Sequence, residues 1–200
     1  MSFLDFAALD RHSRYKLMSA AIVPRPIAWV GTLSAAGIGN LAPYSFFNMM
    51  GAAPPLVVLG TMRQDDGRLK DTARNIFDTG EFTINLVAES TLEAVNLTCA
   101  DAPPEVDEAA LARLALEPCR LIAPPRVAAS PVSFECRLSS HVDAAPETVI
   151  LIGEVIAMHV ADAFFDAERL RLDPVAMGRM GRIHGPGAYT RIAVDRQLDR

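Results

Sequence analysis

Pairs of adjacent prolines divide this chain into short segments, and they are the feature that most limits how it can fold. Fourteen of the 200 residues are proline, with pairs at positions 54–55, 103–104 and 124–125. A proline inside a helix removes a backbone hydrogen bond and clashes with the preceding turn. The spacing of these breaks argues against a helical bundle and predicts short elements.

The segments between the breaks are mostly of strand length. The run PIAWVGTL, residues 26–33, is rich in β-forming residues and leads into a turn with Gly37 and Gly39. LAPYSFF, residues 41–47, returns as the second strand of a hairpin, and LVVLGTM, residues 56–62, is apolar enough to be a buried strand. We expect these three strands to form an antiparallel meander. Three more strands are predicted at residues 81–88, 131–142 and 148–160.

Helices are expected to be fewer and shorter. The segment DTARNIFDT, residues 71–79, has apolar residues at helical spacing, with Asp71 or Thr72 as its cap. Ser90 opens a second helix with capping-box spacing, and an acidic, proline-broken stretch from Asp101 to Leu116 becomes helical toward its end. Six strands in succession with two or three helices indicate a mainly β fold with peripheral helices. A closed antiparallel barrel fits this order better than a doubly wound sheet.

The composition is that of one globular domain covering residues 1–200. The net charge is −5 and half of the residues are apolar, which is enough to bury a core. Mild acidity argues against nucleic acid as a partner, because binding phosphate backbones needs a concentrated basic face. No apolar run is long enough to span a membrane and the N-terminus lacks a signal-peptide pattern, so a cytoplasmic location is expected.

The cysteines and histidines show no ligand-like spacing. Cys99, Cys119 and Cys136 are odd in number and widely separated, without a C-x-x-C pair or a nearby histidine. We therefore expect free thiols in a reducing compartment, and neither a disulfide framework nor a metal site.

A candidate anion site lies at Lys70, directly before the predicted helix. The free N–H groups and the positive dipole end of a helix start attract anions, Lys70 adds a full charge, and Thr72 offers a hydroxyl. Arg63 lies in the loop that leads to this position. A phosphate is one ligand for such an arrangement, and a capped surface helix with solvated basic residues is the alternative.

The run NLAPYSFF, residues 40–47, carries the groups that a planar heteroaromatic ligand needs. Asn40 and Ser45 offer side-chain hydrogen bonds, Pro43 leaves a neighbouring carbonyl unpaired, and the aromatic residues supply walls. The alternative is that the two phenylalanines of this run fill the core and the outer face of a barrel.

Taken together, these motifs resemble the flavin reductase-like, FMN-binding split-barrel family, which includes flavoredoxin-type proteins. The chain has the R-P-I start at Arg25, the run NLAPYSFF, a P-P-L strand, and K-D-T before G-E-F, in the family's order and spacing. PVSFECRL, ILIGEVIAMHV and the tail with Arg179, Gly181 and Tyr189 are also similar to the family. The resemblance covers a core from about residue 22 to residue 192. It implies a six-stranded Greek-key barrel that forms a homodimer and binds FMN near the dimer interface.

The resemblance also implies roles for individual residues. Lys70, Asp71 and Thr72 would hold the FMN phosphate, and the ring would lie along residues 40–47, largely against backbone groups. The full set of cofactor-binding residues that it implies is Arg25, Thr32, Asn40, Leu41, Ala42, Pro43, Tyr44, Ser45, Phe46, Phe47, Arg63, Lys70, Asp71, Thr72 and Arg179.

A flavoprotein of this kind needs no catalytic side chain of its own, because the flavin carries the redox chemistry. The sequence shows no catalytic triad or carboxylate pair, and His184 in the tail is either a proton donor or a surface residue.

The first hypothesis is an oxidoreductase whose FMN takes a hydride from NAD(P)H and passes electrons to an acceptor. The second is a flavoprotein oxygenase acting on a small organic molecule, and the third is an electron carrier that does not react with NAD(P)H. Since no G-x-G-x-x-G motif follows a strand, a nicotinamide would stack directly on the flavin.

Overall fold

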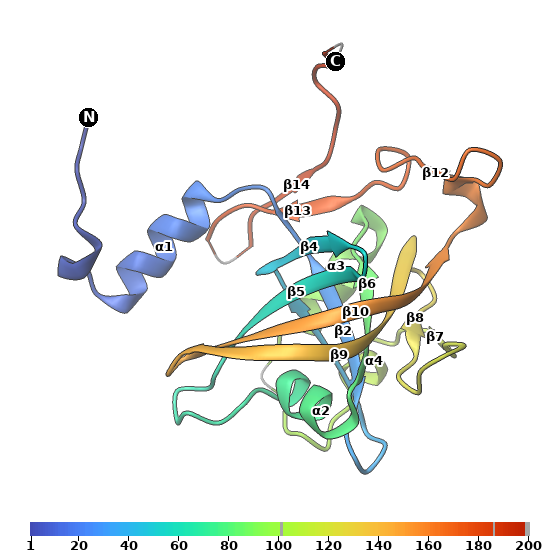
Figure 1. Ribbon diagram of the computed structural model, residues 1–200, viewed down its shortest axis with the longest axis horizontal. Helices are drawn as coiled ribbons and strands as arrows, with labels where there is room; N and C mark the ends of the chain where they lie inside the picture. Colours follow the sequence, from blue (N-terminus) through green and yellow to red (C-terminus); the bar gives the residue numbers. More distant parts are fainter. Residues whose placement is uncertain (101, 186, 199–200) are drawn as a thin grey trace.

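A computed structural model describes residues 1–100, 102–185 and 187–198 (Figure 1). Asp101, where the predicted acidic stretch begins, lies outside the described residues. One large curved sheet makes up most of the molecule, with short helices around it, so the expectation of a mainly β fold is confirmed. In the described part of the chain, no helix is long and apolar enough to cross a membrane.

Seven antiparallel strands form the main sheet in the order β3-β2-β6-β9-β10-β5-β4. The β2–β3 hairpin is the predicted one, with Gly37 in the left-handed region at φ 81°. β10 pairs with both β9 and β5, so its apolar sequence belongs to an interior strand. The strands of this sheet are β2 Ala28–Leu33, β3 Gly39–Tyr44, β4 Phe47–Ala52, β5 Pro55–Met62, β6 Glu81–Leu86, β9 Val132–Ala145 and β10 Thr148–Val160.

The helices lie around this sheet. Lys70 is the N-cap of α2 and no side chain caps its first turn, so the prediction that Asp71 or Thr72 caps the helix is wrong. Both are already inside the helix, because the chain turns helical directly after the extended Lys70. α1 was not predicted; its first turn is capped by Asp10, which accepts from Ser13 N at 2.9 Å. The α-helices are α1 Arg11–Ala21, α2 Asp71–Thr79, α3 Leu92–Leu97 and α4 Glu108–Leu111, and short 3-10 helices span Phe6–Ala8, Glu89–Thr91 and Asp162–Phe164.

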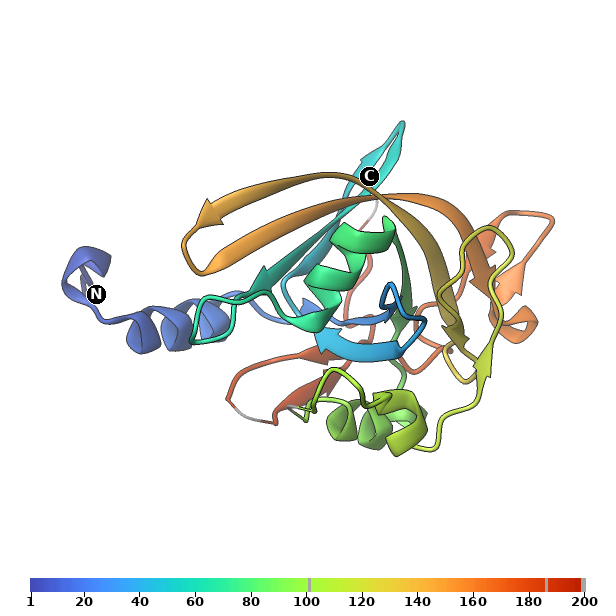
Figure 2. The same ribbon diagram turned by 90° about the horizontal axis from the view of Figure 1, so that it is seen from below.

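The two outermost strands of the main sheet are consecutive in the chain, and this forces the sheet to roll up. Only Ser45 and Phe46 separate β3 at one edge from β4 at the other. The carbonyl of Phe46 accepts a hydrogen bond from Gly60 N at 2.7 Å, which ties the crossing to β5. Figure 2 shows the resulting curvature, with the β9–β10 hairpin arching over α2.

The roll is not the closed six-stranded barrel that was expected. The main sheet has seven strands, and no backbone ladder joins β3 to β4 among the described residues. The outer edge of β3 explains this. Leu41 N donates to Oε2 of Glu108 at 3.0 Å, and Pro43, two residues along the same edge, has no N–H to donate. Two successive donor positions of this edge are therefore lost to a further strand, and the barrel stays split.

The predicted meander is also wrong after Tyr44. The chain bends at Ser45 and Phe46, and a separate strand, β4, then pairs with β5. β5 has β4 and β10 as its neighbours and does not pair with β3. The aromatic run is divided between elements: Tyr44 ends β3, Ser45 and Phe46 lie between the strands, and Phe47 begins β4 and packs against the core.

β2 is buried on both faces and separates two apolar clusters. Ala28 and Val30 belong to the cluster inside the roll. Trp29, which points the other way, belongs to a second cluster with Val95 of α3, and its indole N–H donates to Thr98 Oγ1 at 2.8 Å. The run PIAWVG is therefore apolar on both faces because α3 and α4 cover the side of β2 that would otherwise face water.

A smaller sheet joins the beginning and the end of the chain. β1 (Arg25–Pro26) pairs with β13 (Met180–Arg182), which pairs with β14 (Tyr189–Arg191). Arg25 lies directly opposite Arg182, so the Gly- and Arg-rich tail is brought beside the R-P-I motif. The remaining short strands are β7 Leu116–Glu117, β8 Arg126–Val127, β11 Phe165–Asp166 and β12 Arg171–Leu172.

Gly153 in β10 leaves room for the ring of Phe82, a buried core residue of β6. A Cβ at position 153 would lie 2.4 Å from Cζ of Phe82. We predict that Gly153→Ala lowers the free energy of unfolding by about 1–3 kcal/mol, as overpacking of a core does, when measured by urea denaturation. Phe82→Leu in the Gly153→Ala background should lose less than the sum of the two single losses.

Gly187→Ala is the control, because no heavy atom of the described residues lies within 4 Å of a Cβ at that position. It should change the free energy of unfolding by less than about 0.5 kcal/mol. Strictly additive losses for Gly153→Ala and Phe82→Leu would contradict the steric explanation.

Candidate functional site

Two adjoining clefts lie against the end of β3. The first cleft has a volume of about 450 Å³ and the second of about 710 Å³, both within the range of small-molecule sites. Pro43, Tyr44 and Cys99 line both clefts, so a ligand lying across this strand would reach from one into the other. The first cleft is also lined by Asn40, Ala42, Gln64, Arg68, Lys70, Asp71, Thr72, Arg74 and Glu108.

The start of α2 makes one wall of the first cleft. The first intrahelical bond is donated by Arg74 N to Lys70 O at 3.0 Å, so the N–H groups of residues 71–73 have no partner within the helix. Asp71 pairs with Arg74 at 2.6 Å, whereas Lys70 is exposed and makes no ion pair with any described residue. The wall therefore offers a free ammonium group and free N–H groups to an anion.

A network of uncharged side chains joins the strands to this helix behind the cleft. Asn40 Nδ2 donates to Thr72 Oγ1 at 2.8 Å and to Thr32 Oγ1 at 3.3 Å. Asn75 Nδ2 donates to the same Thr32 oxygen at 3.1 Å. Thr72 Oγ1 thus accepts from Asn40, and its hydroxyl also lies beside that of Tyr44. The network thus holds β2, β3 and the start of α2 in one arrangement.

Two buried acidic groups border the first cleft. Burial raises the pKa of Tyr44 to about 12, so its hydroxyl stays protonated near neutral pH and remains a hydrogen-bond donor beside Thr72. Burial likewise raises the pKa of the Glu108 carboxyl, which the hydrogen bond from Leu41 N partly opposes. The Leu41 side chain points away from the cleft into the apolar cluster of Trp29.

The second cleft is lined by cations and aromatic rings. His12, Lys16, Arg25, Arg182 and His184 contribute the basic groups, and no aspartate or glutamate lines it among the described residues. The lining of the second cleft is therefore basic, although the chain as a whole has a net charge of −5. Its remaining wall residues include Tyr15, Ser19, Ser45, Asn96 and Tyr189.

Arg25 is the most deeply placed of these cations, with 6% of its surface exposed. Its guanidinium donates to Ser45 Oγ at 3.2 Å, to the Ile22 carbonyl at 3.2 Å and to the Ser19 carbonyl, and none of these partners carries a negative charge. Burial, together with the nearby Arg182, lowers the pKa of Arg25. A buried cation without a carboxylate favours an anionic ligand nearby.

The tail supplies the opposite wall of the second cleft. Arg182 lies over the Tyr189 ring at 4.7 Å from its centroid and donates to the Gly185 carbonyl at 2.8 Å. These contacts place His184 and Tyr189 at the cleft, opposite the residues of α1. The site can therefore hold a flat, negatively charged molecule between aromatic and basic groups.

The remaining sequence-predicted residues lie elsewhere. Arg63 pairs with Asp143 at 3.0 Å in a separate depression, and Arg179 is largely buried beside its bridge partner Ala88; neither lines the two clefts. Thr32 is buried behind Asn40, so it positions that residue and reaches no cleft.

The two phenylalanines of the NLAPYSFF run do not line the clefts either. Phe47 packs on the core, and Phe46 contacts the ring of Tyr15 at 6.1 Å between centroids. Both lie on the far side of the bend at Ser45.

Sequence reasoning missed much of both clefts. Arg74 lies one helical turn after Lys70, and that spacing is the signal that could have revealed it. The basic residues contributed by α1 and β13, among them Lys16 and Arg182, carry no local signal, because only the pairing of β1 with β13 brings the two ends of the chain together.

Comparison with known proteins identifies the family. Residues 18–177 match the model of the flavin reductase like domain. The chain belongs to the flavin reductase-like family, and the resemblance seen in the sequence is confirmed.

Three similar proteins illustrate the family. An uncharacterized protein of Deinococcus radiodurans is 43% identical over 191 residues, covering 93% of this chain and 84% of that protein. The crystal structure of 2-nitrobenzoate 2-nitroreductase NbaA from Pseudomonas fluorescens is 32% identical with a TM-score of 0.91, covering 100% of this chain and 96% of that one. Nitrilotriacetate monooxygenase component B from Bacillus cereus is 31% identical with a TM-score of 0.93, covering 99% and 98%.

Glu108 gives the folded state a pH dependence that can be measured. Its raised pKa means that the folded state binds the proton more tightly than the unfolded state does. The contribution of this group to the free energy of unfolding is therefore full below the ordinary pKa of 4.5 and is lost as the pH rises through the raised value. We predict that Glu108→Gln, which keeps an acceptor for Leu41 N, gains stability relative to the unchanged protein as the pH rises from 4.5 toward neutrality.

Urea denaturation at a series of pH values checks this prediction. The control is Glu105→Gln, which removes one negative charge from an exposed position three residues away. A difference in stability between Glu108→Gln and the unchanged protein that stays constant over this range would contradict the prediction.

Proposed function

We propose that this protein is a cytoplasmic, FMN-dependent oxidoreductase of the NAD(P)H:flavin reductase type. FMN would occupy the first cleft, and the second cleft would admit the electron donor or acceptor. The observation that carries the proposal is that the two clefts meet along Pro43 and Tyr44. One has a free helix start, and the other is lined by basic side chains with no Asp or Glu among the described residues. Membership of the flavin reductase-like family supports the same function.

The residues of the first cleft fit the phosphate end of FMN. Lys70 supplies a free ammonium group, the first turn of α2 supplies unpaired N–H groups, and Thr72 has an O–H to donate. Arg74 and Arg68 add positive charge at the same cleft. Arg63 and Arg179, which the family resemblance had suggested, are not part of this proposal.

The residues of β3 fit the flat end of the cofactor. Ala42, Pro43 and Tyr44 line the first cleft from the free edge of the strand, where backbone groups are not used by a neighbouring strand. Tyr44 contributes a protonated hydroxyl, and Asn40 is held in place by Thr32. Backbone groups at a free edge can hydrogen-bond with the polar atoms at the edge of a ring, while Pro43 and Tyr44 offer apolar surface to its face.

When bound, FMN supplies the redox chemistry, accepting a hydride from NAD(P)H and passing electrons to an acceptor. The protein binds and orients the reactants and excludes water between them. Arg25 and Arg182 would attract the phosphates of a nicotinamide nucleotide into the second cleft. His184 lines the same cleft and is the candidate for delivering a proton to a reduced acceptor.

A second candidate function is a reaction on a small organic anion, including oxygenation. The observation that favours it is the aromatic and arginine-rich lining of the second cleft, with Tyr15 and Tyr189 beside Arg25 and Arg182. The 2-nitroreductase that is 32% identical is named for an aromatic carboxylate, 2-nitrobenzoate. An electron carrier that does not react with NAD(P)H is the remaining alternative.

The absorption spectrum of the purified protein, mixed with FMN and desalted, tests these alternatives. Flavin bands that co-elute and bleach with NADH or NADPH without oxygen support the reductase. Bands that co-elute and bleach only with dithionite indicate a carrier or an enzyme reduced by a partner. If no flavin co-elutes and none binds in an equilibrium titration, the proposed function is wrong.

We predict that Lys70→Ala weakens FMN binding by about 1–3 kcal/mol, the contribution of a charge-assisted hydrogen bond. This corresponds to a rise in the dissociation constant of roughly 5- to 150-fold, measured by quenching of flavin fluorescence. Ser45→Ala should have a smaller effect, because Ser45 lines the second cleft and not the first.

Arg169→Ala is the control for the loss of one positive charge. Arg169 is exposed, and its one ion pair among the described residues is with Asp166, three positions earlier. Equal FMN affinities for Lys70→Ala and Arg169→Ala would remove Lys70 from the phosphate site.

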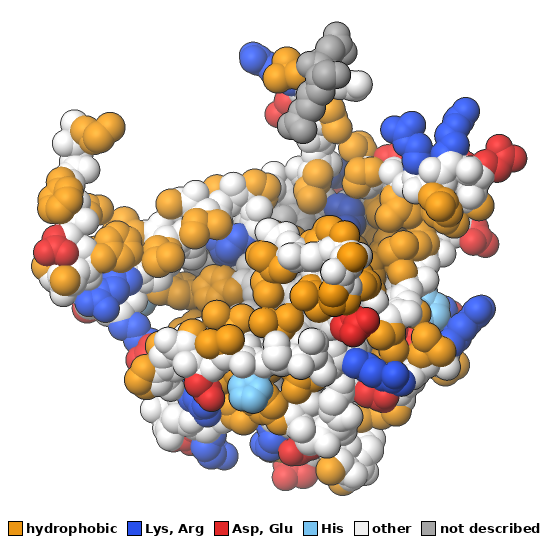
Figure 3. All heavy atoms as spheres, in the orientation of Figure 1, with side chains coloured by type: hydrophobic (Ala, Val, Ile, Leu, Met, Phe, Trp, Pro, Cys, Tyr) orange, Lys and Arg blue, Asp and Glu red, His pale blue; other side chains and the backbone are white. Residues whose placement is uncertain are grey.

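We also propose that the protein is a homodimer that covers an apolar strip on α1 and β4. Tyr15, Met18 and Ile22 lie on one face of the helical segment and are exposed, and Met49 and Met50 are exposed on β4. Figure 3 shows hydrophobic side chains gathered on this side of the molecule. α1 projects away from the roll, which leaves this face uncovered within one chain (Figure 1).

We predict that Met18→Lys converts a dimer into a monomer, because a charge would be buried in the covered strip. Sedimentation velocity at micromolar protein concentration measures the change. Leu111→Lys, at an exposed position on α4, is the control and should leave the dimer intact. An unchanged protein that sediments as a monomer would refute the proposal.

A further inference from the structure

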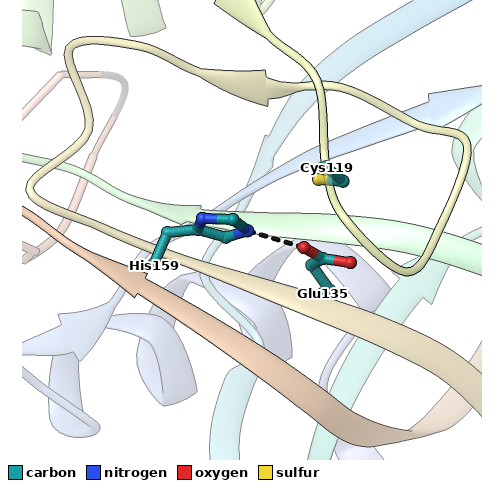
Figure 4. Close-up of side chains that lie close together, drawn as sticks. All are labelled: Cys119, Glu135 and His159. Carbon is teal, nitrogen blue, oxygen red and sulfur yellow. Dashed lines mark hydrogen bonds and ion pairs between the residues drawn. The ribbon is translucent and has the colours of Figure 1, made fainter.

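Cys119, Glu135 and His159 come from three separate segments and meet on the outer face of the main sheet (Figure 4). One ligand atom from each, the sulfur, a carboxylate oxygen and a ring nitrogen, lies within 4.8 Å of the other two. Cys119 is in the loop between β7 and β8, Glu135 is in β9 and His159 is in β10. The cluster lies outside the two clefts described above.

The strand register explains how two of these residues meet. Glu135 pairs with Ala157, and His159 follows two residues later on the same face of β10, so the two side chains are diagonal neighbours. His159 Nε2 lies 2.6 Å from Glu135 Oε1. The opposite face of β9 points into the core, where Cys136 is completely buried.

Polar side chains of the same sheet face hold the loop that carries Cys119. Glu81 accepts from Ala123 N at 2.9 Å, and Asn85 accepts from Val127 N at 2.9 Å. These bonds attach the loop at two points beyond Cys119, while the cysteine itself lies near the start of the loop. Closer to the cysteine, the backbone N–H groups of Arg120 and Leu121 donate to Glu135, so the Cys119 sulfur is held near the sheet.

Glu135 is the residue that most needs explanation, because its side chain is 0% exposed on an interior strand. Its two oxygens accept from Arg120 N at 2.8 Å and from Leu121 N at 2.7 Å. These N–H groups orient the carboxylate in the way that outer hydrogen bonds orient metal ligands. A carboxylate, an imidazole and a thiol directed at one point form a ligand set for a borderline metal ion, and not for Mg²⁺ or Ca²⁺.

We propose that Cys119, Glu135 and His159 form a Zn²⁺ site with three protein ligands. Glu135 and His159 also line a surface cleft of about 590 Å³, so a water molecule or a small anion can reach the fourth position. Three protein ligands and one open position are the pattern of a site at which zinc can bind an exogenous molecule. This proposal does not depend on the function proposed above.

Binding requires a small rearrangement and the loss of a proton. In a tetrahedral site the three ligand atoms would be about 3.3–3.6 Å apart, given zinc bonds of about 2.0–2.3 Å. His159 Nε2 must move away from Glu135 and present its lone pair, with its remaining hydrogen on Nδ1. The Cys119 thiol becomes a thiolate, and its proton is released to water.

Cobalt titration of the full-length protein tests the proposal. The protein is dialysed against a chelator and titrated with Co²⁺, and difference spectra are recorded against metal-free protein. We expect a thiolate-to-cobalt band in the near ultraviolet that saturates at one Co²⁺ per chain and disappears when Zn²⁺ is added. Mg²⁺ should not displace the cobalt.

Variants connect the signal to the cluster. Cys119→Ser should abolish the band, and His159→Gln should weaken Zn²⁺ binding by at least about tenfold. Cys99→Ser, which removes an exposed cysteine outside the cluster, is the control and should keep the band. No band in the unchanged protein, or an equal band in Cys119→Ser, would show that the three residues only pin the loop to the sheet.

Thermal denaturation gives a second measurement for the case in which Cys119→Ser does not fold. Zn²⁺ should raise the melting temperature of the unchanged protein and of Cys99→Ser, and should raise that of His159→Gln much less. An equal rise in the unchanged protein and in His159→Gln would overturn the proposal.

Discussion

The rest of the structure depends on the two-residue crossing from β3 to β4. Ser45 and Phe46 join opposite edges of a seven-stranded sheet. The sheet must therefore curve until its two edge strands are close enough for two residues to connect them. The roll stays split, because Pro43 cannot donate from the free edge and Glu108 takes the Leu41 N–H. Both clefts lie along that split, which is where backbone groups of β3 are not used by a neighbouring strand.

The two clefts present positive charge by different means. In the first, Lys70 and the unpaired N–H groups of α2 face solvent, and an uncharged network behind them holds the strand and the helix together. In the second, Arg25 is buried with only neutral partners and lies opposite Arg182 in the small sheet. Lysine and arginine side chains thus line both adjoining clefts of an acidic chain, as expected for a site that draws in phosphates or carboxylates.

The outer face of the main sheet also has a distinct chemical character. Glu81, Thr83 and Asn85 alternate along β6 and bond the backbone of the loop that covers them. Glu135 of β9 also accepts hydrogen bonds from the backbone of this loop. Among these polar side chains, it is the one that lies beside a histidine and a cysteine. The bonds that attach the loop therefore also assemble the proposed metal ligands.

The sequence by itself determined the features that depend on neighbours along the chain. The β2–β3 hairpin follows from a run of β-forming residues and a glycine turn, and the start of α2 follows from Lys70 preceding an amphipathic segment. The family motifs pointed to the same strand and helix that line the first cleft.

Only the tertiary structure decided the features that depend on register between distant segments. It separated Arg63 from the cleft, it gave β4 a partner other than β3, and it joined α1 to the tail through β1 and β13. It also brought Cys119 to His159. No local pattern encodes such meetings, because they depend on which strands pair and in which register, and the paired segments lie far apart in the chain.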